Sequence, residues 1–525
     1  MRALSLWDWL VLAGYGVLLL IVGFSTARRH TRAEDYFLAS RASRWPLIGL
    51  SLLASNISST ALIGLAGAAY ATGISVYDYE WSAAVILVIF CVFLLPFVLR
   101  SRVYTMPEFL ERRYDARARL YLALLTLFLN VFLDSAGSLY SGSLVCQLVL
   151  PGVPLIAITA TLAGAAGLYT IIGGLRAVIY TETLQALVLI GGATAIAAEA
   201  FHRAGGWHAV MTQVDPAMLS LIRPLDDRAV PWPGLLFGIP VLGFYYWCTN
   251  QFIVQRVLSA HDVEQGRRGV LLAGLLKLPV LFLMVLPGTC AIVLFPHLAR
   301  PDTVYPTLIF SLLPAGLMGL VIASFVAATM ASVASTLNSA STLLTMDVVK
   351  RLLPRLSDAR TVRVGKLSTT AFLVLAVLWS SQVAHFGSLW QYLQAVLAYA
   401  VPPIVALFGV GLFWRGANGV GAAVMLLVGT ACAIALFLSN IVFGTTHLHF
   451  LYVAPLLLAI DILVLVIASR AAPRADRTDT EPLLFTAAAL REDSAQLQGI
   501  PPWRNYRVQA AALLALTALV VFLFR

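Results

Sequence analysis

Charged residues are scarce in this sequence of 525 residues. Only 11% of the residues are Asp, Glu, Lys or Arg, whereas 60% are hydrophobic. A soluble globular protein carries about 25% charged and about 45–50% apolar residues. The shortage of charge excludes a soluble multidomain enzyme, and the surplus of apolar residues excludes a disordered or fibrous protein.

Cysteine and histidine are also rare. The five cysteines are scattered through apolar stretches, and the eight histidines are dispersed. This spacing argues against a disulfide framework and against a metal cluster. The sequence has neither an HExxH zinc motif nor a GxxxxGK[ST] phosphate loop. We therefore expect no catalysis, no organic cofactor and no direct use of ATP.

Long apolar stretches are what the sequence has instead. A helix that crosses a bilayer needs about 20 mostly apolar residues, and we identify fourteen such stretches. They predict an all-α integral membrane protein with residues 1–525 in a single transporter domain. A polar, proline-containing stretch at about 470–505 is predicted to be a cytoplasmic linker. The predicted spans are 7–27, 45–74, 80–99, 120–150, 153–172, 178–200, 233–255, 269–295, 315–346, 367–385, 389–414, 419–440, 447–469 and 506–524.

The net charge of +10 does not indicate nucleic acid as a partner, because of where the charges lie. With fourteen crossings, most of the 35 Lys and Arg residues fall in loops on one side, including Arg256 after the seventh span. Lys277 lies within a span. Loops rich in Lys and Arg stay in the cytoplasm, which predicts a plasma-membrane protein with both termini outside. The external side receives only Arg2, Arg203, Arg223, Arg228, Arg300 and Arg525.

Two spans carry unusual runs of small and polar residues. In the second span, the side chains between Ala54 and Thr60 compete for backbone groups and weaken a regular helix. A helix broken there would expose carbonyls to a cation, although serines bonded back to their own helix are the simpler interpretation. In the ninth span, residues 327–342 include the hydroxyls of Ser332, Ser335 and Ser339. That run fits either a packing seam or a set of oxygen ligands for Na⁺.

Ionisable and amide side chains also fall in or near the spans. Asp134 and Lys277 lie within spans, so both should face the protein interior or a water-filled cavity. Whether they pair with each other stays open. Glu80, beside aromatic residues at the end of the third span, fits either an interfacial belt or a binding site. Amides at Asn250 and Gln394 lie near aromatic residues, which suits a hydroxyl-rich ligand.

Several of these motifs resemble signatures of the sodium:solute symporter family. The run GGLRAVIYTETLQ at 173–185 is one, and the segments from Glu34 to Trp81 and from Ser335 to Asp347 are others. The stretch from Pro231 to Arg256 resembles the sodium/glucose cotransporter branch in particular. The resemblance extends from about residue 7 to the C-terminus.

This resemblance implies a leucine-transporter-like core at residues 45–414, in which ten helices form two inverted repeats of five. One extra helix at 7–27 precedes the core, and three helices within 419–525 follow it. The first and sixth core helices are expected to break at mid-membrane, in the regions 56–59 and 247–251.

The resemblance also implies a Na⁺ site. Its ligands would be the backbone carbonyls of Ala54, Ile57 and Ala328 and the hydroxyl of Ser332. Ala331 stands where the family usually has a second serine, so one ligand is missing. A second Na⁺ site of some relatives corresponds here to Ala331, Ala334, Ser335 and Glu182. Two alanines in that set lead us to expect one coupling ion per solute.

The sugar site of the family corresponds to five positions in this sequence. An aromatic gate over it would be Phe252, Tyr245 or Tyr246. Ala61 and Asp134 depart from the family pattern, which leaves another polyol or related hydroxylated solute open. The five positions are Asn56, Glu80, Asn250, Lys277 and Gln394.

Together these features predict a secondary active symporter rather than an enzyme. It would couple Na⁺ entry to the uptake of a small hydroxylated solute, with glucose or galactose as the first expectation. Its partners would be the solute, Na⁺ and the lipid bilayer. Within transport, the alternatives are a polyol, inositol, carboxylate or amino acid, and coupling to protons through Asp134 or Glu182. A solute sensor or a channel would be a different class, and the short linker at 470–505 argues against a signalling domain.

Overall fold

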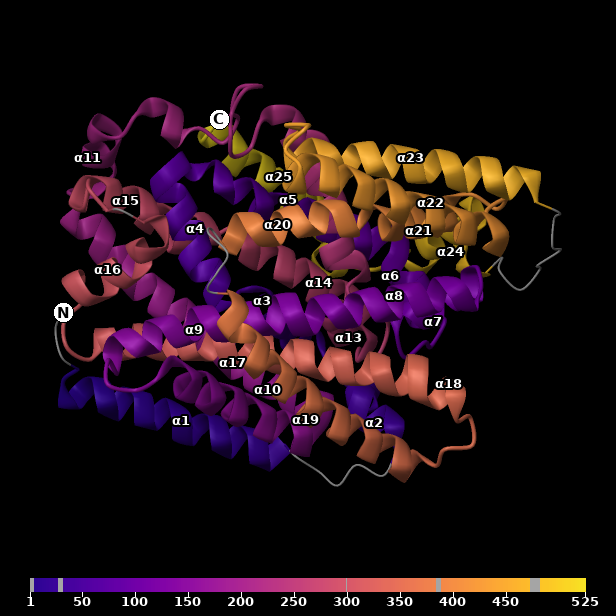
Figure 1. Cartoon of the computed structure of the whole chain (residues 1–525), viewed down its shortest axis with the longest axis horizontal. Coiled ribbons are helices and arrows are strands. Elements are labelled where there is room, and N and C mark those ends of the chain that lie inside the picture. The colour runs from indigo at the N-terminus through magenta and orange to yellow at the C-terminus, as the bar shows by residue number, and fades with distance from the viewer. Residues whose placement is uncertain (1–3, 27–31, 299, 384–388, 473–481) are drawn as a thin grey trace.

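The computed structural model describes residues 4–26, 32–298, 300–383, 389–472 and 482–525. Every regular element in these ranges is a helix, and only two isolated β-bridges occur there, Ser43 with Ala260 and Arg223 with Pro231. Most of the long helices run side by side along the long axis of the molecule (Figure 1). The prediction of an all-helical membrane protein is confirmed.

Nine helical runs in the described part of the chain are long and apolar enough to cross a membrane. Three bent pairs of shorter helices raise that number to twelve if each pair is one span. The continuous runs are α1 (Leu6–Thr26), α5 to α6 (Ile74–Arg100), α8 to α9 (Ala116–Val149), α10 (Leu155–Arg203), α17 to α18 (Leu317–Leu352), α19 (Asp358–Val383), α22 with the turn after it (Gly419–Val442), α23 (Phe450–Ala471) and α25 (Tyr506–Leu523).

The three bent pairs are interrupted by short breaks, and prolines explain one of the bends. α3 (Trp45–Asn56) meets α4 (Ser59–Thr72) at 62°, across two residues outside either helix. α14 (Val263–Lys277) meets the helical segment Leu281–Leu294, which includes α15 (Leu286–Leu294), at 41°. α20 (Leu389–Ala400) meets α21 at 49°, and α21 (Pro402–Phe413) begins with two prolines. Proline cannot donate a helical hydrogen bond, so a break before it is expected.

α10 contains the predicted spans 153–172 and 178–200 in one helical run. At about 1.5 Å per residue its 49 residues would measure roughly 70 Å, more than twice the hydrocarbon thickness of a bilayer. Gly174 interrupts the run with φ 56° and ψ −156°. A Cβ at this position would lie 2.5 Å from the carbonyl oxygen of Tyr36 in α2 (Ala33–Leu38). Glycine is therefore required by both the conformation and the close approach.

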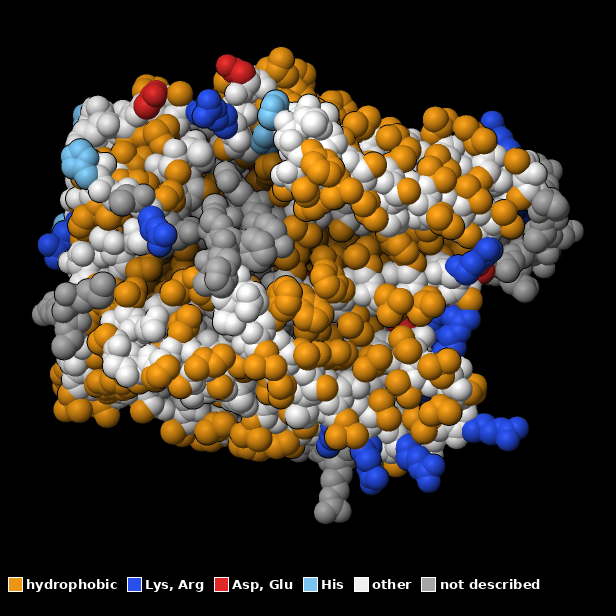
Figure 2. Space-filling view, viewed as in Figure 1, with side chains coloured by type: hydrophobic (Ala, Val, Ile, Leu, Met, Phe, Trp, Pro, Cys, Tyr) orange, Lys and Arg blue, Asp and Glu red, His pale blue; other side chains and the backbone are white. Residues whose placement is uncertain are grey.

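The outside of the molecule is apolar, and much of its polar content is inside. Hydrophobic side chains cover much of the face seen in Figure 2, and many large ones are exposed. α17 (Leu317–Leu343) lies at the centre, contacts α10, α3, α1 and α9, and buries almost all of its serines and threonines. This inversion is typical of a bundle surrounded by lipid, where interfaces are rich in small and hydroxyl residues.

The two ends of the bundle differ in charge. Most Lys and Arg side chains visible in Figure 2 gather at the end that carries α2, α7 (Met106–Arg113) and α18 (Lys350–Leu352). The opposite end carries α11 (Gly206–Gln213), α16 (Val304–Leu312) and the beginning of α1 (Figure 1). There the Gly319 N–H donates to Asp8 Oδ1 at 2.7 Å, and the Leu221 N–H donates to the Phe524 carbonyl at 2.8 Å.

Part of the predicted linker is structured. Residues 473–481 lie outside the described part of the chain, but α24 (Ala487–Gln496) follows them. Asp493 in α24 pairs with Arg267 of α14 at 2.7 Å and with Arg507 of α25 at 2.7 Å. The linker is therefore tied to two membrane helices.

Candidate functional site

The break between α3 and α4 releases backbone groups in the middle of the molecule. Ile57 has extended geometry at ψ 91°, and Ser58 caps α4 by accepting the Ala61 N–H at 3.2 Å. In a continuous helix the Ser58 N–H would bond the carbonyl of Ala54. It donates instead to the Asn56 carbonyl at 3.1 Å. The Ala54 carbonyl thus loses its normal helical partner.

A second break lies in the region expected from the sequence. A π-helical turn over Tyr245–Thr249 ends at Asn250, whose ψ is 125°. The Asn250 side chain then caps α13 (Gln251–Leu258) by accepting the Phe252 N–H at 3.3 Å. Asn250 is buried in this cap and does not line the cavity described below.

Three of the predicted solute residues form one buried cluster. Lys277 Nζ in α14 donates to Glu80 Oε2 in α5 (Asp78–Ile89) at 2.5 Å. The same ammonium bonds Asn56 Oδ1 at the end of α3 and lies 5.2 Å from the ring centre of Trp247. Lys277 therefore pairs with Glu80 and not with Asp134. Glu80 is not an interfacial belt residue, because only 5% of its surface is exposed.

A cavity of about 110 Å³ adjoins this cluster. Tyr246 and Trp247 form part of its apolar wall, and Ala61 lines it as well. Of the five predicted solute residues, Asn56, Glu80 and Gln394 line the cavity, whereas Lys277 reaches it through its bonds to two of them. The cavity's polar lining comes from Asn56, Ser58, Thr60, Glu80, Asp134 and Gln394.

Among the three candidates for the aromatic gate, only Tyr246 lines the cavity. Phe252 lies behind it, with the two rings 5.5 Å apart and almost perpendicular. Tyr245 is fully buried in the core. The sequence could not separate these three positions, because a π-helical turn shifts the direction of side chains relative to an α-helix.

The predicted ion ligands lie where α17 packs against the α3–α4 break. Ala54, Ile57, Ala328 and Ser332 are each at most 4% exposed. Ile57 and Ala328 share one apolar cluster, and Ala331 packs against Ala54 in another. Carbonyls and hydroxyls are the groups that hold Na⁺ at broken membrane helices.

A hydroxyl network connects this region to α9 (Ala136–Val149). Ser332 Oγ lies 3.0 Å from Ser138 Oγ, and the Ser138 carbonyl accepts from Ser59 Oγ at 2.9 Å. Ser141 bonds both Ser59 and Thr60 at 2.8 Å. The hydroxyls of the second span therefore bond across to α9 rather than only to their own helix. The sequence did not reveal this role of α9.

A buried ion pair lies at the positions that correspond to the second Na⁺ site of some relatives. Arg256 Nη2 donates to Glu182 Oε1 at 2.6 Å and to Ser335 Oγ at 2.7 Å. Glu182 also accepts from Ser51 and Ser335, and from Ser55 at 3.0 Å. Both members of the pair are fully buried. The prediction that Arg256 lies in a cytoplasmic loop is wrong, because α13 carries this side chain into the core.

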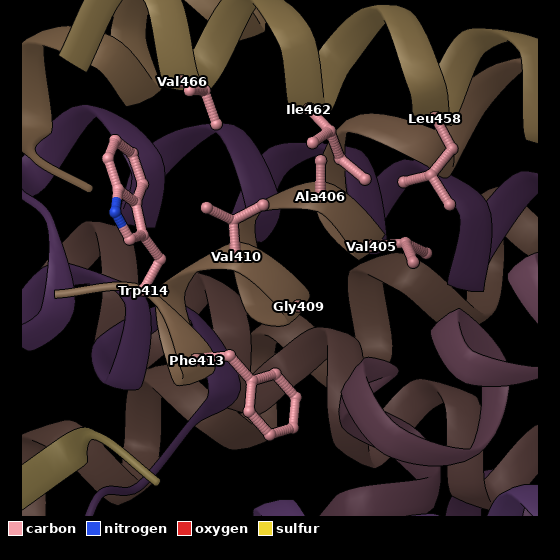
Figure 3. A pocket seen from close by; sticks show the side chains of 9 residues that line it. All are labelled: Val405, Ala406, Gly409, Val410, Phe413, Trp414, Leu458, Ile462 and Val466. Atoms are coloured by element: carbon pink, nitrogen blue, oxygen red, sulfur yellow. The ribbon is translucent and has the colours of Figure 1, made fainter. Parts of the chain in front are cut away.

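The molecule has a larger groove, but it lacks polar groups. Valines, leucine, isoleucine and aromatic residues of α21 and α23 line a groove of about 410 Å³ (Figure 3). Such a lining offers no partner for solute hydroxyls, so the smaller polar cavity is the candidate solute site.

The profile of the sodium:solute symporter family matches residues 36–429 of this chain. The chain belongs to the sodium:solute symporter family. The symporter is 34% identical to the sodium/glucose cotransporter 4 of Danio rerio, over 88% of this chain and 78% of that protein. It is also 34% identical to the sodium/myo-inositol cotransporter 2 of Oryctolagus cuniculus, over 89% of this chain and 77% of that protein. The chain is thus a membrane transporter and not an enzyme.

Solved structures show the same fold. The symporter superposes on a Na⁺-coupled sialic acid symporter with a TM-score of 0.80 at 22% identity, over 90% of this chain and 99% of the other. A nucleobase-cation-symport-1 family transporter gives a TM-score of 0.58 at 15% identity, over 87% of this chain and 99% of the other.

Proposed function

We propose that the symporter couples Na⁺ entry to the uptake of a monosaccharide such as glucose or galactose. The observation that carries this proposal is the adjacency of two features. A cavity lined by a carboxylate and amides lies beside a helix break that frees the Ala54 carbonyl. The names of the relatives, sodium/glucose cotransporters among them, support the same assignment.

In this proposal the solute binds between Asn56, Glu80 and Gln394, with Lys277 behind them and Asn250 fixing the nearby break. Carboxylate and amide groups bond several ring hydroxyls at once, and a buried site rejects analogues that leave these groups unpaired. Tyr246 and Trp247 supply apolar faces for the sugar ring.

The ion in this proposal is Na⁺, held by the carbonyls of Ala54, Ile57 and Ala328 and by the Ser332 hydroxyl. It joins the α3–α4 break to α17 and so favours one conformation of the carrier. Coupling follows because a ligand shifts a conformational equilibrium only by its differential affinity for the two states. At the positions that correspond to the second Na⁺ site of some relatives, the Arg256 guanidinium already pairs with Glu182. This positive charge takes the place of a second ion, which supports one Na⁺ per solute.

The finer topology belongs to the same proposal. Counting α10 as two spans divided at Gly174, and Gly234–Thr249 with α13 as one broken span, extends the twelve candidate spans to fourteen. Residues 45–414 would then hold two inverted repeats of five helices. The Lys- and Arg-rich end would face the cytoplasm and both termini the outside of the plasma membrane.

Inositol is the second candidate solute, because sodium/myo-inositol cotransporters are among the relatives at 34–36% identity. Uptake into proteoliposomes separates the candidates. Labelled glucose, galactose and myo-inositol are each supplied with an inward Na⁺ gradient and with a matched choline gradient. Accumulation of one sugar only with Na⁺ supports the proposal, whereas equal uptake in choline contradicts it.

A further inference from the structure

Two acidic side chains line the cavity, Glu80 and Asp134. Among the described residues, Asp134 has no hydrogen-bond or ion-pair partner. It comes from a π-helical turn, Leu129–Ser135, and lines the same cavity as Glu80 and Gln394. Glu80 is neutralised by Lys277 at 2.5 Å. No ion pair or hydrogen bond reaches Asp134 from the described part of the chain, which sets this carboxyl group apart from Glu80 on the same cavity.

The neighbours of Asp134 hold it in this position. Asn130 Nδ2 donates to Ser339 Oγ of α17 at 2.9 Å, and Ser135 Oγ lies 2.5 Å from Thr336 Oγ1 of the same helix. These two bonds fix both ends of the turn against α17. Asp134, between them, faces the cavity instead. π-Helical turns of this kind occur frequently at functional sites.

Asp134 is half-buried where it borders the cavity, and a ligand with a positive charge forms a charge-assisted hydrogen bond with a carboxylate in such a position. The cavity wall also contains the faces of Tyr246 and Trp247, and aromatic faces attract ammonium groups. We propose that Asp134 is a specificity-determining residue, which makes the symporter prefer a hydroxylated solute with a protonated amine, such as a 2-amino sugar. This inference rests on the proposed solute site and deepens it.

The test compares three solutes and three proteins, all as the full chain in proteoliposomes with an inward Na⁺ gradient. The solutes are D-glucosamine, D-glucose and 2-deoxy-D-glucose, at about pH 6.5, where an amine of ordinary α-amino basicity is protonated. The proteins are the unmodified symporter, Asp134→Asn and Asp461→Asn. Asp461 is the matched control, because it is a fully buried aspartate of α23 that does not line the cavity.

Charge-assisted hydrogen bonds predict a preference for glucosamine over glucose of about tenfold to a hundredfold in KM. Asp134→Asn should lose this preference, and Asp461→Asn should keep it. The proposal is overturned if the unmodified protein accepts glucosamine no better than glucose, as it would if Asp134 held a proton. It is also overturned if the preference survives in Asp134→Asn, or if 2-deoxyglucose is preferred equally.

A second readout does not depend on transport. Thermal stabilisation of the purified protein by each solute should show the same preference and the same loss in Asp134→Asn. Na⁺-dependent uptake without an amine preference contradicts this inference and leaves the proposed function standing. An amine preference that persists unchanged in choline contradicts Na⁺ coupling and leaves the inference standing.

Discussion

Lys277 and Glu80 lie 2.5 Å apart, on α14 and α5, with 0% and 7% of their side chains exposed. Removing one member of a buried pair strands the other charge, which costs about 3–5 kcal/mol. The pair therefore holds Glu80 in place beside the cavity.

Replacement of this lysine, as Lys277→Ala, is expected to abolish solute binding while Na⁺ binding persists. The reason is that Glu80 and Asn56 lose the ammonium that orients them. The measurement is Na⁺-dependent uptake together with Na⁺-induced thermal stabilisation. Lys350→Ala, at the end of α17 to α18 and away from the cavity, is the matched control. An unchanged KM for sugar in Lys277→Ala would show that the cluster has no part in solute binding.

Gln394 gives an independent test from another element. It lines the cavity from α20 and carries no charge, so Gln394→Ala removes solute hydrogen bonds without stranding an ion. We expect sugar affinity to fall by about tenfold or more, because the solute hydroxyls lose their partner. Isothermal titration or inhibition of labelled uptake measures this. Gln496→Ala, on the linker helix α24, should leave affinity unaltered.

Ser332→Ala is expected to weaken the Na⁺ dependence of uptake by about tenfold, because the ion loses a hydroxyl ligand. Ser341→Ala is a suitable control on the same helix, where the serine hydroxyl donates to the Gly365 carbonyl at 2.7 Å. Uptake is titrated with NaCl at constant ionic strength. A Na⁺ half-saturation identical in both variants would contradict the assignment of Ser332.

The Arg256–Glu182 pair should behave as a structural unit. Arg256→Met leaves the Glu182 carboxylate buried without its counter-charge, and Glu182→Gln does the same to the Arg256 guanidinium. Each single variant is expected to lose about 3–5 kcal/mol in the free energy of unfolding. The double variant should recover much of that loss. A double-mutant cycle in detergent measures the coupling. Strictly additive losses would mean that the two side chains act separately.

Asp493 predicts a pH effect on the docking of α24. Burial raises the pKa of this carboxyl, but the hydrogen bond from Tyr506 and the charges of Arg267 and Arg507 outweigh it and hold the pKa below its ordinary value. A depressed pKa contributes stability above the unfolded-state pKa and loses it as pH falls through the folded-state pKa. Docking of α24 should therefore weaken below about pH 4.

Hydrogen exchange of Ala487–Gln496 measures that docking. Asp493→Asn should raise exchange already at neutral pH, whereas Glu492→Gln, whose carboxylate is 61% exposed, should not. Equal protection in Asp493→Asn and the unmodified protein would contradict the role of Asp493.

Much of the fold was predictable because a membrane imposes simple requirements. Apolar length located most of the helices, whereas the α3–α4 break was expected from the family resemblance, because the polar residues alone left an unbroken helix as the simpler interpretation. The same resemblance pointed to Asn56, Glu80 and Gln394, which the structure brings to one cavity.

Pairing between distant segments was not predictable. The Lys277–Glu80 bond joins residues almost two hundred positions apart. Arg256 lies just after the end of a predicted span, so the sequence alone places it in a loop. Periodicity carries no information about such contacts. The hydroxyl network of Ser138 and Ser141 was missed for the same reason, since isolated serines in a helix usually bond to their own backbone.

Na⁺-driven accumulation is the central claim, and one measurement tests it most directly. Labelled solute uptake into proteoliposomes is followed with an inward Na⁺ gradient, with an equal choline gradient and with Na⁺ equal on both sides. The account predicts transient accumulation above equilibrium only in the first condition, and its loss in Ser332→Ala. Equal uptake in all three conditions would contradict coupling to Na⁺.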